Sequence, residues 1–290
     1  MTILETNIAS NWETGYNMCM IEYPNNSVSV RLYDRPLTIL SDEEYRLRRK
    51  AGTVVEPFDG KRVREVSDFS ELDPKVDPLE SRRISLARTK RKISEYARCV
   101  KWEYFCTFTF DPARIDRTNY KSVCSKMQTW LKNARDRKAK GLQYLAVPEL
   151  HKDCESWHFH VLLANTGDIV FSDSGIIKDG KVIWNIPGWS WGYSSATIVK
   201  DCIRVARYIS KYMTKECHAL SRGAHRYFVS NNLPKPKKSI FVVEPGEEME
   251  LVQDLAESLG LTISWISHPI DGYVGVTYIE LRPEMTEEGN

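Results

Sequence analysis

Two histidines one residue apart, His158 and His160, are the pair in this sequence best suited to metal chemistry. They lie in the apolar run 157–163, which is typical of a β-strand. Because side chains alternate between the faces of a strand, both imidazoles would lie on one face. Two imidazoles at that separation can share a metal ion. The same pair can also bridge polar groups of a core, so the metal reading requires a third ligand.

Glu149 is the candidate for that third ligand. It lies near the end of a second expected strand, 143–150, and a short charged turn separates this strand from the histidines. An antiparallel return of the chain would bring Glu149 close to His158. One carboxylate and two imidazoles would hold a divalent cation and leave coordination positions open for a substrate. His151 would share the face of Glu149 if the strand continued.

A helix expected over residues 197–215 carries a candidate nucleophile. One of its faces is apolar, and another bears two tyrosines and two lysines at helical spacing, namely Tyr208, Lys211, Tyr212 and Lys215. A tyrosine can attack phosphorus, and a lysine one turn away can stabilise the phenolate or the charge on the phosphorane. The alternative is an amphipathic helix whose tyrosines pack with wet tips and whose lysines interact with the helix dipole.

Composition indicates a folded protein. The 290 residues are 42% hydrophobic and 11% aromatic, enough to bury a core in one large domain or two modest ones. No apolar run approaches the roughly 18 residues of a membrane helix, and the first residues lack the pattern of a signal peptide. The seven cysteines contain no Cys-x-x-Cys pair, which favours reduced thiols. A cytoplasmic protein without a membrane partner is expected.

Charge is unevenly distributed along the chain. From Phe241 onward there are eleven acidic residues and one basic residue, Arg282, so the remaining chain is strongly basic although the net charge is +2. A helix expected over 81–96 concentrates six basic side chains, namely Arg82, Arg83, Arg88, Lys90, Arg91 and Lys92. Such a stripe favours salt-sensitive binding to nucleic acid, and an ordinary solvated helix face is the alternative.

Other segments must position these residues. A strand is expected over 102–110, with Thr107 and Thr109 on one face and Cys106, Phe108 and Phe110 on the other. An amphipathic helix is expected over 119–138. The Gly-, Trp- and Ser-rich segment 166–195 is expected to form a hairpin or a mobile excursion that could lie over a site.

The order of these elements resembles the three-motif pattern of the HUH endonuclease superfamily, in particular the rolling-circle replication initiator (Rep) proteins of phages and plasmids. Residues 105–110 resemble the first motif, 157–160 the second, metal-binding motif, and 208–215 the third motif in its two-tyrosine form. Residues 226–231 and 233–236 are similar to the segment that follows in phage-type members. The resemblance covers about residues 98–235.

The resemblance implies an α+β fold, in which a central antiparallel sheet carries helices on one face, as in a ferredoxin- or RRM-like Rep palm. The other face would carry the metal and the tyrosine helix. We therefore expect an N-terminal extension of unknown role over 1–97, which includes the basic helix, and a nicking domain over 98–238. An acidic C-terminal α/β tail over 239–290 would follow.

The implied activity is nicking and joining of single-stranded DNA at a replication origin through a 5′-phosphotyrosine. Glu149, His158 and His160 would bind Mg²⁺ or Mn²⁺, although two imidazoles also suit zinc. Tyr208 would be the first nucleophile and Tyr212 the second, with Lys211 assisting. Lys215 and the six basic residues of the expected helix 81–96 would contact DNA. The sequence contains no Walker loop, so a host helicase and polymerase are expected partners, in the host cytoplasm if the protein is phage-encoded.

Alternative functions have distinguishing features. A relaxase or transposase of the same superfamily would perform similar strand transfer, but in relaxases the tyrosine precedes the histidines. A non-catalytic nucleic-acid-binding protein could use a ferredoxin-like sheet with Tyr104, Phe105 or Phe108 stacking on bases. A zinc hydrolase is disfavoured because the sequence lacks a His-Glu-x-x-His pattern.

Overall fold

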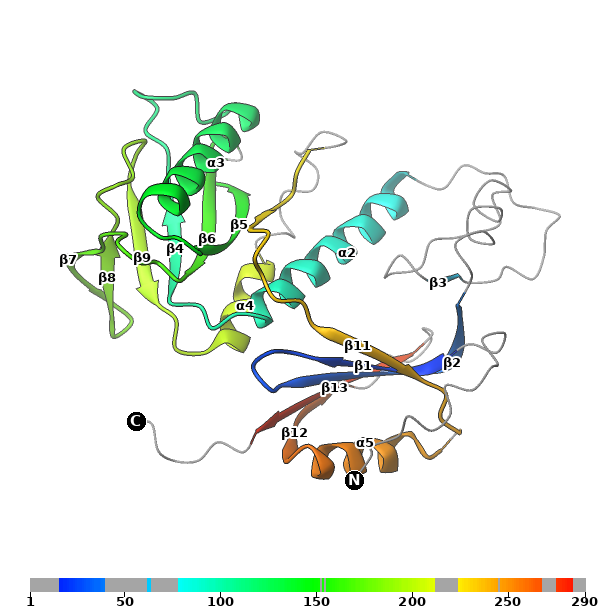
Figure 1. Ribbon diagram of the computed structural model, residues 1–290. Coiled ribbons are helices and arrows are strands. Elements are labelled where there is room, and N and C mark those ends of the chain that lie inside the picture. The colour runs from blue at the N-terminus through cyan, green and yellow to red at the C-terminus, as the bar shows by residue number, and fades with distance from the viewer. Residues whose placement is uncertain are drawn as a thin grey trace. The chain divides into compact units, whose positions relative to one another are not determined.

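A computed structural model describes residues 16–39, 62–63, 78–151, 153, 155–211, 224–244, 246–267 and 275–283. Within these residues the fold is α+β with two antiparallel sheets, which confirms the predicted class (Figure 1). The chain divides into two units. The terminal unit contains residues 1–81 and 236–290, and the central unit contains residues 82–235. No helix in the described part of the chain is long and apolar enough to cross a membrane.

The central unit is built on a seven-stranded sheet in which the described neighbours all pair antiparallel. In spatial order the strands are β10 (Phe228–Val229), β5 (Gln143–Leu150), β6 (Trp157–Ala164), β4 (Tyr104–Phe108), β9 (Ser194–Ile198), β8 (Lys181–Asn185) and β7 (Ser172–Lys178). The predicted strand 143–150 and the histidine strand are confirmed as β5 and β6. The segment 166–195 contains the β7–β8 hairpin and extends the same sheet.

One face of this sheet is covered by helix α3 (Tyr120–Arg137). The side chain of Asn119 accepts a hydrogen bond from the backbone N–H of Ser122 and caps the helix start. Met127 and Leu131 of α3 pack in a core with Phe108 and other inward residues of the strands. The predicted helix 119–138 is thus confirmed, and so is the alternation that buries Cys106, Phe108 and Phe110 together.

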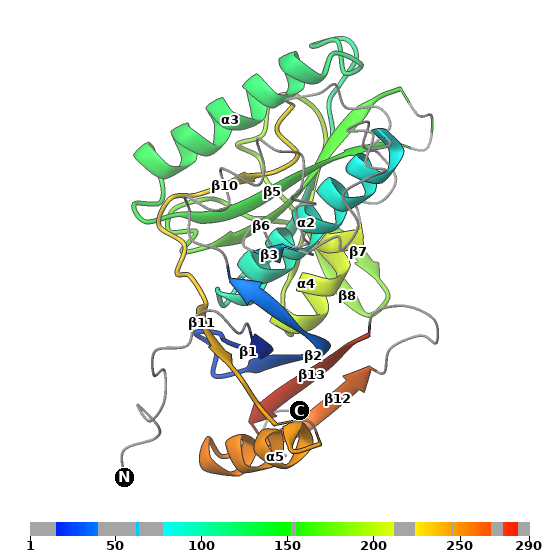
Figure 2. The same cartoon turned by 90° about the vertical axis from the view of Figure 1, so that its right-hand side faces the viewer.

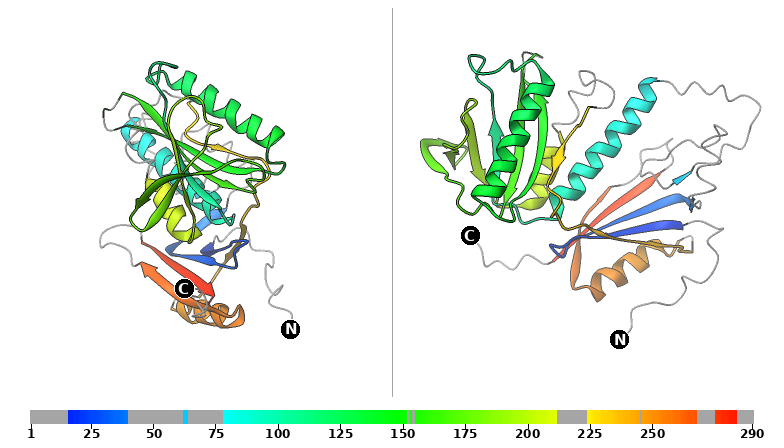
Figure 3. Two further views of the ribbon diagram at one scale, coloured as in Figure 1. Left: turned by 90° about the vertical axis from the view of Figure 1, so that its left-hand side faces the viewer. Right: turned by 45° about the horizontal axis from the view of Figure 1, so that its top comes forward.

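Two helices, α2 (Pro78–Arg98) and α4 (Cys202–Lys211), lie on the opposite side of the sheet from α3 (Figures 1 and 3). The indole N–H of Trp102 donates to the carbonyl of Ala97 at 2.7 Å, and Arg226 donates to the hydroxyl of Ser85 at 3.1 Å. The sequence analysis assigned the basic helix to an N-terminal extension and helices to one face of the sheet. Instead, α2 from Arg82 onward belongs to the central unit, and helices flank both faces.

The tyrosine helix begins later than predicted. Residues 194–198 form strand β9, and α4 starts at Cys202 rather than at 197. Asp201 explains the start, because its carboxylate accepts hydrogen bonds from the backbone N–H groups of Ile203 and Arg204 at 2.8 and 3.0 Å. The described helix ends at Lys211, so Tyr212 and Lys215 lie outside the described residues.

The terminal unit joins strands from both ends of the chain in a second sheet. Its order is β11 (Lys237–Phe241), β1 (Tyr16–Glu22), β2 (Val28–Ile39), β13 (Val276–Pro283) and β12 (Leu261–Ser267), and β3 (Arg62–Val63) also pairs with β2. The sequence analysis treated the N-terminal and C-terminal segments separately, whereas β1 pairs with β11 and β2 pairs with β13. These pairings align Met18, Val30 and Ile279 in one core.

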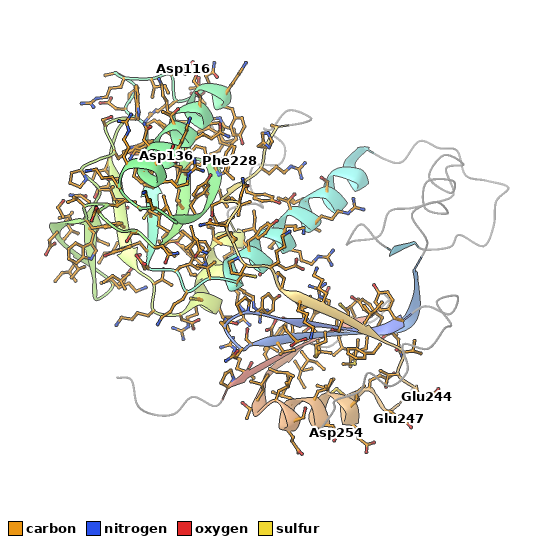
Figure 4. All side chains as sticks on the ribbon, in the orientation of Figure 1. Asp116, Asp136, Phe228, Glu244, Glu247 and Asp254 are labelled. Carbon is orange, nitrogen blue, oxygen red and sulfur yellow. The ribbon has the colours of Figure 1, made fainter. Side chains whose placement is uncertain are left out.

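Helix α5 (Glu248–Ser258) covers one face of this second sheet (Figure 2). Val252 and Ala256 of α5 are buried against the strands. The acidic residues of this region point the other way, since Glu244, Glu247 and Asp254 are exposed and project away from the sheet (Figure 4). The excess of negative charge predicted for the C-terminal region is therefore carried in part on the outer side of α5.

Candidate active site

Three side chains converge on the face of the central sheet opposite α3. Strands β5 and β6 pair Glu149 with His158 and Val147 with His160, which places the carboxylate beside both imidazoles. One carboxylate oxygen, Oε2 of Glu149, lies 2.6 Å from Nε2 of His160 and 3.0 Å from Nε2 of His158. The two Nε2 atoms are 3.1 Å apart. The antiparallel return and the shared face predicted from the sequence are thus present.

This arrangement of donor atoms fits a bound cation. The ligand atoms of the three residues all lie within 4.8 Å of one another. Without an ion, two imidazole nitrogens share a single carboxylate oxygen and also face each other, which leaves at most one good hydrogen bond for each proton. A divalent cation would instead accept a lone pair from each of the three atoms. The cluster can therefore hold a metal ion.

Burial and hydrogen bonding set the charges of the cluster. Burial alone would raise the pKa of Glu149, but hydrogen bonds from His158 and His160 and their charges outweigh it and lower the pKa to about 2. Burial lowers the pKa of His160 from its ordinary value, and the hydrogen bond to Glu149 only partly offsets this effect. The chain thus favours an ionised carboxylate beside a neutral His160, which is the state that binds a metal.

A threonine on the neighbouring strand orients one of the imidazoles. Strand β4 pairs Thr107 with His160, and the Thr107 hydroxyl lies 3.1 Å from Nδ1 of His160. When Nδ1–H donates to this hydroxyl, the lone pair of Nε2 points at the cluster. Nδ1 of His158 is buried and has no hydrogen-bond partner among the described residues. The support provided by Thr107 is therefore specific to His160.

His151 lies beside the cluster but does not join it. Its ring centroid is 5.8 Å from that of His158, and its side chain is exposed. The Nδ1 atom of His151 faces Asp153 at 3.9 Å. The backbone N–H of His151 donates to the carbonyl of Ser156 at 2.7 Å, which closes the turn between the two strands. The converging carboxylate–imidazole group is thus formed by Glu149, His158 and His160.

The ring of Phe105 connects the histidines to the tyrosine helix. Its centroid is 5.4 Å from that of His160, nearly parallel at 21°, and 5.2 Å from that of Tyr208, tilted by 66°. Phe105 and Thr107 alternate onto the same face of β4 as the histidines. Tyr208 therefore lies one aromatic ring away from the candidate metal ligands.

Helix α4 presents Tyr208 to solvent on its polar side. Val205, Ala206 and Ile209 are buried, whereas Tyr208 is 48% exposed. Lys211, one turn later, is also exposed and is the last described residue of the helix. The predicted division between an apolar stripe and a polar face is confirmed over the described part of α4. Tyr208 is thus accessible to a large substrate.

The predicted basic stripe lies on α2, on the same side of the sheet as the histidines. The exposed ammonium groups are those of Lys90 and Lys92, and Lys92 lies 5.8 Å above the ring of Tyr96. Arg88 and Arg91 are partly buried. Arg82 and Arg83 belong to α2, but their side chains lie outside the described residues. A partial basic surface thus faces solvent beside the site.

Sequence reasoning missed the roles of Thr107 and Phe105. It placed Thr107 on one face of its strand without a partner, and it treated Phe105 as a residue that could stack on a base. The signal that could have found them is alternation, because residues 105 and 107 share a face with each other. Only the pairing register of β4 with β6 shows that this face is the histidine face.

Residues 103–217 match the family model of the replication-associated protein ORF2/gene 2 protein. The matched region begins just before β4 and extends beyond α4, so it contains all the residues that converge at the site, although it covers less than half of the chain. No curated protein and no solved structure matches the chain. The family match supports a Rep-type replication initiator.

Proposed function

We propose that the protein initiates replication by nicking and rejoining single-stranded DNA through a covalent tyrosine intermediate. The observation that carries this proposal is the convergence of Glu149, His158 and His160 one aromatic ring away from the exposed Tyr208. The match to a replication-associated family over the same residues supports it. The likeness to HUH endonucleases, with two tyrosines on one helix, supplies the type of chemistry.

The spacing of the ligand atoms favours an octahedral ion such as Mg²⁺ or Mn²⁺. Adjacent ligands of an octahedral ion at about 2.1 Å lie about 3.0 Å from each other. Tetrahedral zinc with similar bond lengths would require about 3.4 Å. The separations of 2.6 to 3.1 Å in the cluster are closer to the octahedral value. Of the two ions, Mn²⁺ is better suited to imidazole ligands.

The cleavage step exchanges one ester for another. The phenolic oxygen of Tyr208 forms a bond to the scissile phosphorus as the bond from phosphorus to the 3′ oxygen breaks. Tyr208 loses its proton, and the leaving oxygen gains one, so a 5′-phosphotyrosine and a free 3′ hydroxyl result. A bound divalent cation would polarise the scissile phosphate and stabilise the leaving oxygen. Because no bond energy is lost to hydrolysis, the reverse step can rejoin the strand.

Residues near Tyr208 complete the proposed machinery. A phenol with an ordinary pKa near 10 needs assistance at neutral pH, and Lys211 lies one turn away on the same helix. Its ammonium group would stabilise the phenolate or the charge on the pentavalent phosphorus. Tyr212 follows on the same helical arc and would act as a second nucleophile while Tyr208 still holds the first DNA end.

The DNA strand would approach along α2. Lys90 and Lys92 are exposed on the side of the sheet that carries the histidines, and they would neutralise phosphates without reading sequence. Arg82, Arg83, Arg88, Arg91 and Lys215 would add to the same contact surface. Unwinding and synthesis would then require a host helicase and polymerase.

The decisive experiment is covalent capture of a labelled origin oligonucleotide, followed on a denaturing gel. Tyr208→Phe should abolish the adduct because it removes the attacking oxygen. Tyr278→Phe is the matched control, since it removes the hydroxyl of a part-exposed tyrosine in the terminal unit. Full capture by Tyr208→Phe would refute the assignment of the nucleophile.

A second experiment tests the metal site. The double variant His158→Ala, His160→Ala should lose divalent-dependent nicking and keep weak binding to single-stranded DNA. The wild-type protein should gain thermal stability with Mn²⁺, about 2.7 kcal/mol at a hundredfold excess over Kd, and the double variant should not. Nicking that persists in EDTA would contradict the proposal.

A further inference from the structure

A pocket of about 650 Å³ opens at the end of strand β4. Its lining comes from two segments, 109–114 and 187–193, which follow β4 and precede β9. The volume lies within the roughly 300–1,000 Å³ of sites that bind small molecules or single nucleotides. The nicking chemistry proposed above makes no use of this pocket.

The pocket is rigidly constructed. The indole N–H of Trp189 donates to the carbonyl of Thr109 at 2.9 Å, and the Thr109 hydroxyl donates to the carbonyl of Tyr193 at the same distance. Gly192 is required by space, because a Cβ there would lie 2.4 Å from the Thr109 carbonyl oxygen. The buried rings of Phe110 and Trp189 pack edge to face behind these contacts. The site is therefore preformed.

The pocket combines an exposed aromatic ring with a cation. Tyr193 lies at the mouth and is 53% exposed, although the next residue along the strand, Ser194, is buried. Arg114 donates to the carbonyl of Ser190 and lies 3.6 Å from the carboxylate of Asp111. These contacts hold the guanidinium in place and engage only some of its five N–H groups. A ring for stacking and a guanidinium for phosphate are what a nucleotide requires.

The strand register connects the pocket to the candidate active site. Strand β4 pairs Thr107 with His160 on one side and with Ser195 of β9 on the other. The ladder continues in the same register beyond β4, because the N–H of Thr109 donates to the carbonyl of Tyr193 at 2.9 Å. Alternation then puts Thr109 and Tyr193 on the histidine face, about 7 Å along the strand from Thr107.

We propose that this pocket is a subsite for one base of the single-stranded DNA whose phosphate is cleaved at Tyr208. The base stacks on Tyr193, and Arg114 contacts the phosphate of the same nucleotide. An extended strand advances by more than the 3.4 Å per nucleotide of a duplex, so the captured base lies about one or two nucleotides from the scissile phosphate. The inference rests on the proposed function for the direction of the strand.

A DNA strand is favoured over a free nucleotide for two reasons. The pocket is wide open to solvent and offers a single exposed ring and a single arginine, which would hold a lone nucleotide weakly. Attachment to a strand already bound beside α2 and the histidines raises the local concentration of the base at the pocket. The pocket therefore contributes to positioning of a strand bound elsewhere.

The test measures binding of a single-stranded oligonucleotide by fluorescence anisotropy, with the full chain carrying Tyr208→Phe so that no adduct forms. Tyr193→Ala should weaken binding about 5- to 150-fold, the usual effect of losing one stacked base. Tyr193→Phe is the matched control and should bind as tightly as the parent, because stacking requires the ring and not the hydroxyl. Wild-type affinity in Tyr193→Ala overturns the subsite.

A second variant guards against a folding defect. If Tyr193→Ala lowers Tm, Arg114→Gln addresses the same pocket from an exposed position and should also weaken binding. Unchanged binding in Arg114→Gln and in Tyr193→Ala overturns the inference. Tight binding of a free deoxynucleoside monophosphate, equal to that of the oligonucleotide, also overturns it, since the site would then serve nucleotides rather than a strand.

Abasic scanning locates the captured base. In the otherwise unchanged protein, loss of the base at one position about one or two nucleotides from the nick should slow covalent capture, and Tyr193→Ala should remove that dependence. Capture that is indifferent to every abasic position refutes the subsite and leaves the nicking proposal standing. Conversely, a Tyr193-dependent loss of binding without any adduct supports the subsite and refutes the nicking proposal.

Discussion

The hydroxyl of Thr107 lies 3.1 Å from Nδ1 of His160, across the pair of strands β4 and β6. Thr107 makes no contact with the open side of the cluster in this arrangement; it fixes the ring that does. We predict that Thr107→Val weakens Mn²⁺ binding about 10- to 100-fold, because an imidazole without its outer partner ligates less well. Isothermal titration calorimetry measures the change.

Thr107→Ser is the matched control, since it keeps the hydroxyl and removes only a methyl group. Its Mn²⁺ affinity should remain within a few fold of the parent. If Thr107→Val bound Mn²⁺ as tightly as the wild type, His160 would not depend on this hydrogen bond for its orientation.

Metal affinity should depend on pH through the histidines and not through the carboxylate. The pKa of Glu149 is lowered to about 2, so it stays ionised at every pH at which the protein is handled. Burial holds the pKa of His160 below its ordinary value of 6.5, so this imidazole is already neutral at pH 7. Protons therefore compete with the metal only in acid.

The expected titration is a constant Mn²⁺ affinity of His160 between pH 8 and 7 and a loss of affinity as the pH falls through the lowered pKa of that residue. The sign follows because a protonated imidazole has no lone pair for a ligand bond. Calorimetric titrations at a series of pH values provide the measurement. An affinity that already declines from pH 8 to 7 would contradict the neutral state of His160.

The lysines of α2 should act on DNA affinity without changing sequence preference. Lys90→Ala with Lys92→Ala should weaken binding to single-stranded DNA and reduce the slope of log K against log salt by about 1.4, since each phosphate contact contributes about 0.7. Anisotropy titrations at several salt concentrations give the slope. Equal losses are expected for unrelated sequences, because phosphate contacts carry no base information.

The control for this pair is Lys178→Ala with Lys181→Ala. These two lysines are exposed and face each other at the tip of the β7–β8 hairpin, at the edge of the sheet away from α2 (Figure 1). Their removal subtracts the same charge and should leave the slope nearly unchanged. Identical slopes for the two double variants would show that net charge, and not α2, determines DNA binding.

Gly192→Ala should destabilise the protein through a steric clash. The added methyl group would lie 2.4 Å from the carbonyl oxygen of Thr109 and 2.8 Å from the amide nitrogen of Asp111, and both are backbone atoms. Backbone shifts of this kind cost about 1–3 kcal/mol of unfolding free energy. Calorimetry should show a Tm lower by about 2–4 °C for each kcal/mol.

Gly188→Ala is the matched control in the same loop. A Cβ at Gly188 meets no heavy atom within 4 Å, and neither glycine has a positive φ. Gly188→Ala should change the unfolding free energy by less than about 0.5 kcal/mol. A large loss in both variants would point to chain entropy of the loop and not to the close approach at Gly192.

The sequence was sufficient to predict the local part of the site. The short turn between residues 149 and 158 leaves little choice of register, so the pairing of Glu149 with His158 followed from alternation. The start of α4 was less accessible, because the apolar residues Ile198 and Val199 fit a helical stripe as well as a strand. The cap by Asp201 decides between them.

Contacts between distant segments could not be predicted from local patterns. The side-chain amide of Asn17 donates to the carbonyl of Val243 at 2.6 Å, across 226 positions of sequence. Nothing in the alternation of β1 names β11 as its neighbour, since any amphipathic strand offers the same backbone groups. The place of Phe105 between His160 and Tyr208 likewise depends on which strands and helices meet.

The pairing of β1 with β11 and of β2 with β13 has a consequence for how the protein is made. The central unit lies within one continuous stretch of chain, so it can fold while the ribosome still adds residues. The hairpin of β1 and β2 emerges first, yet it lacks both of its outer neighbours until residues 237–283 appear. A two-stranded hairpin is marginally stable in water. The portion synthesised first is therefore among the last to reach its final structure, and the portion bearing the histidines and Tyr208 precedes it.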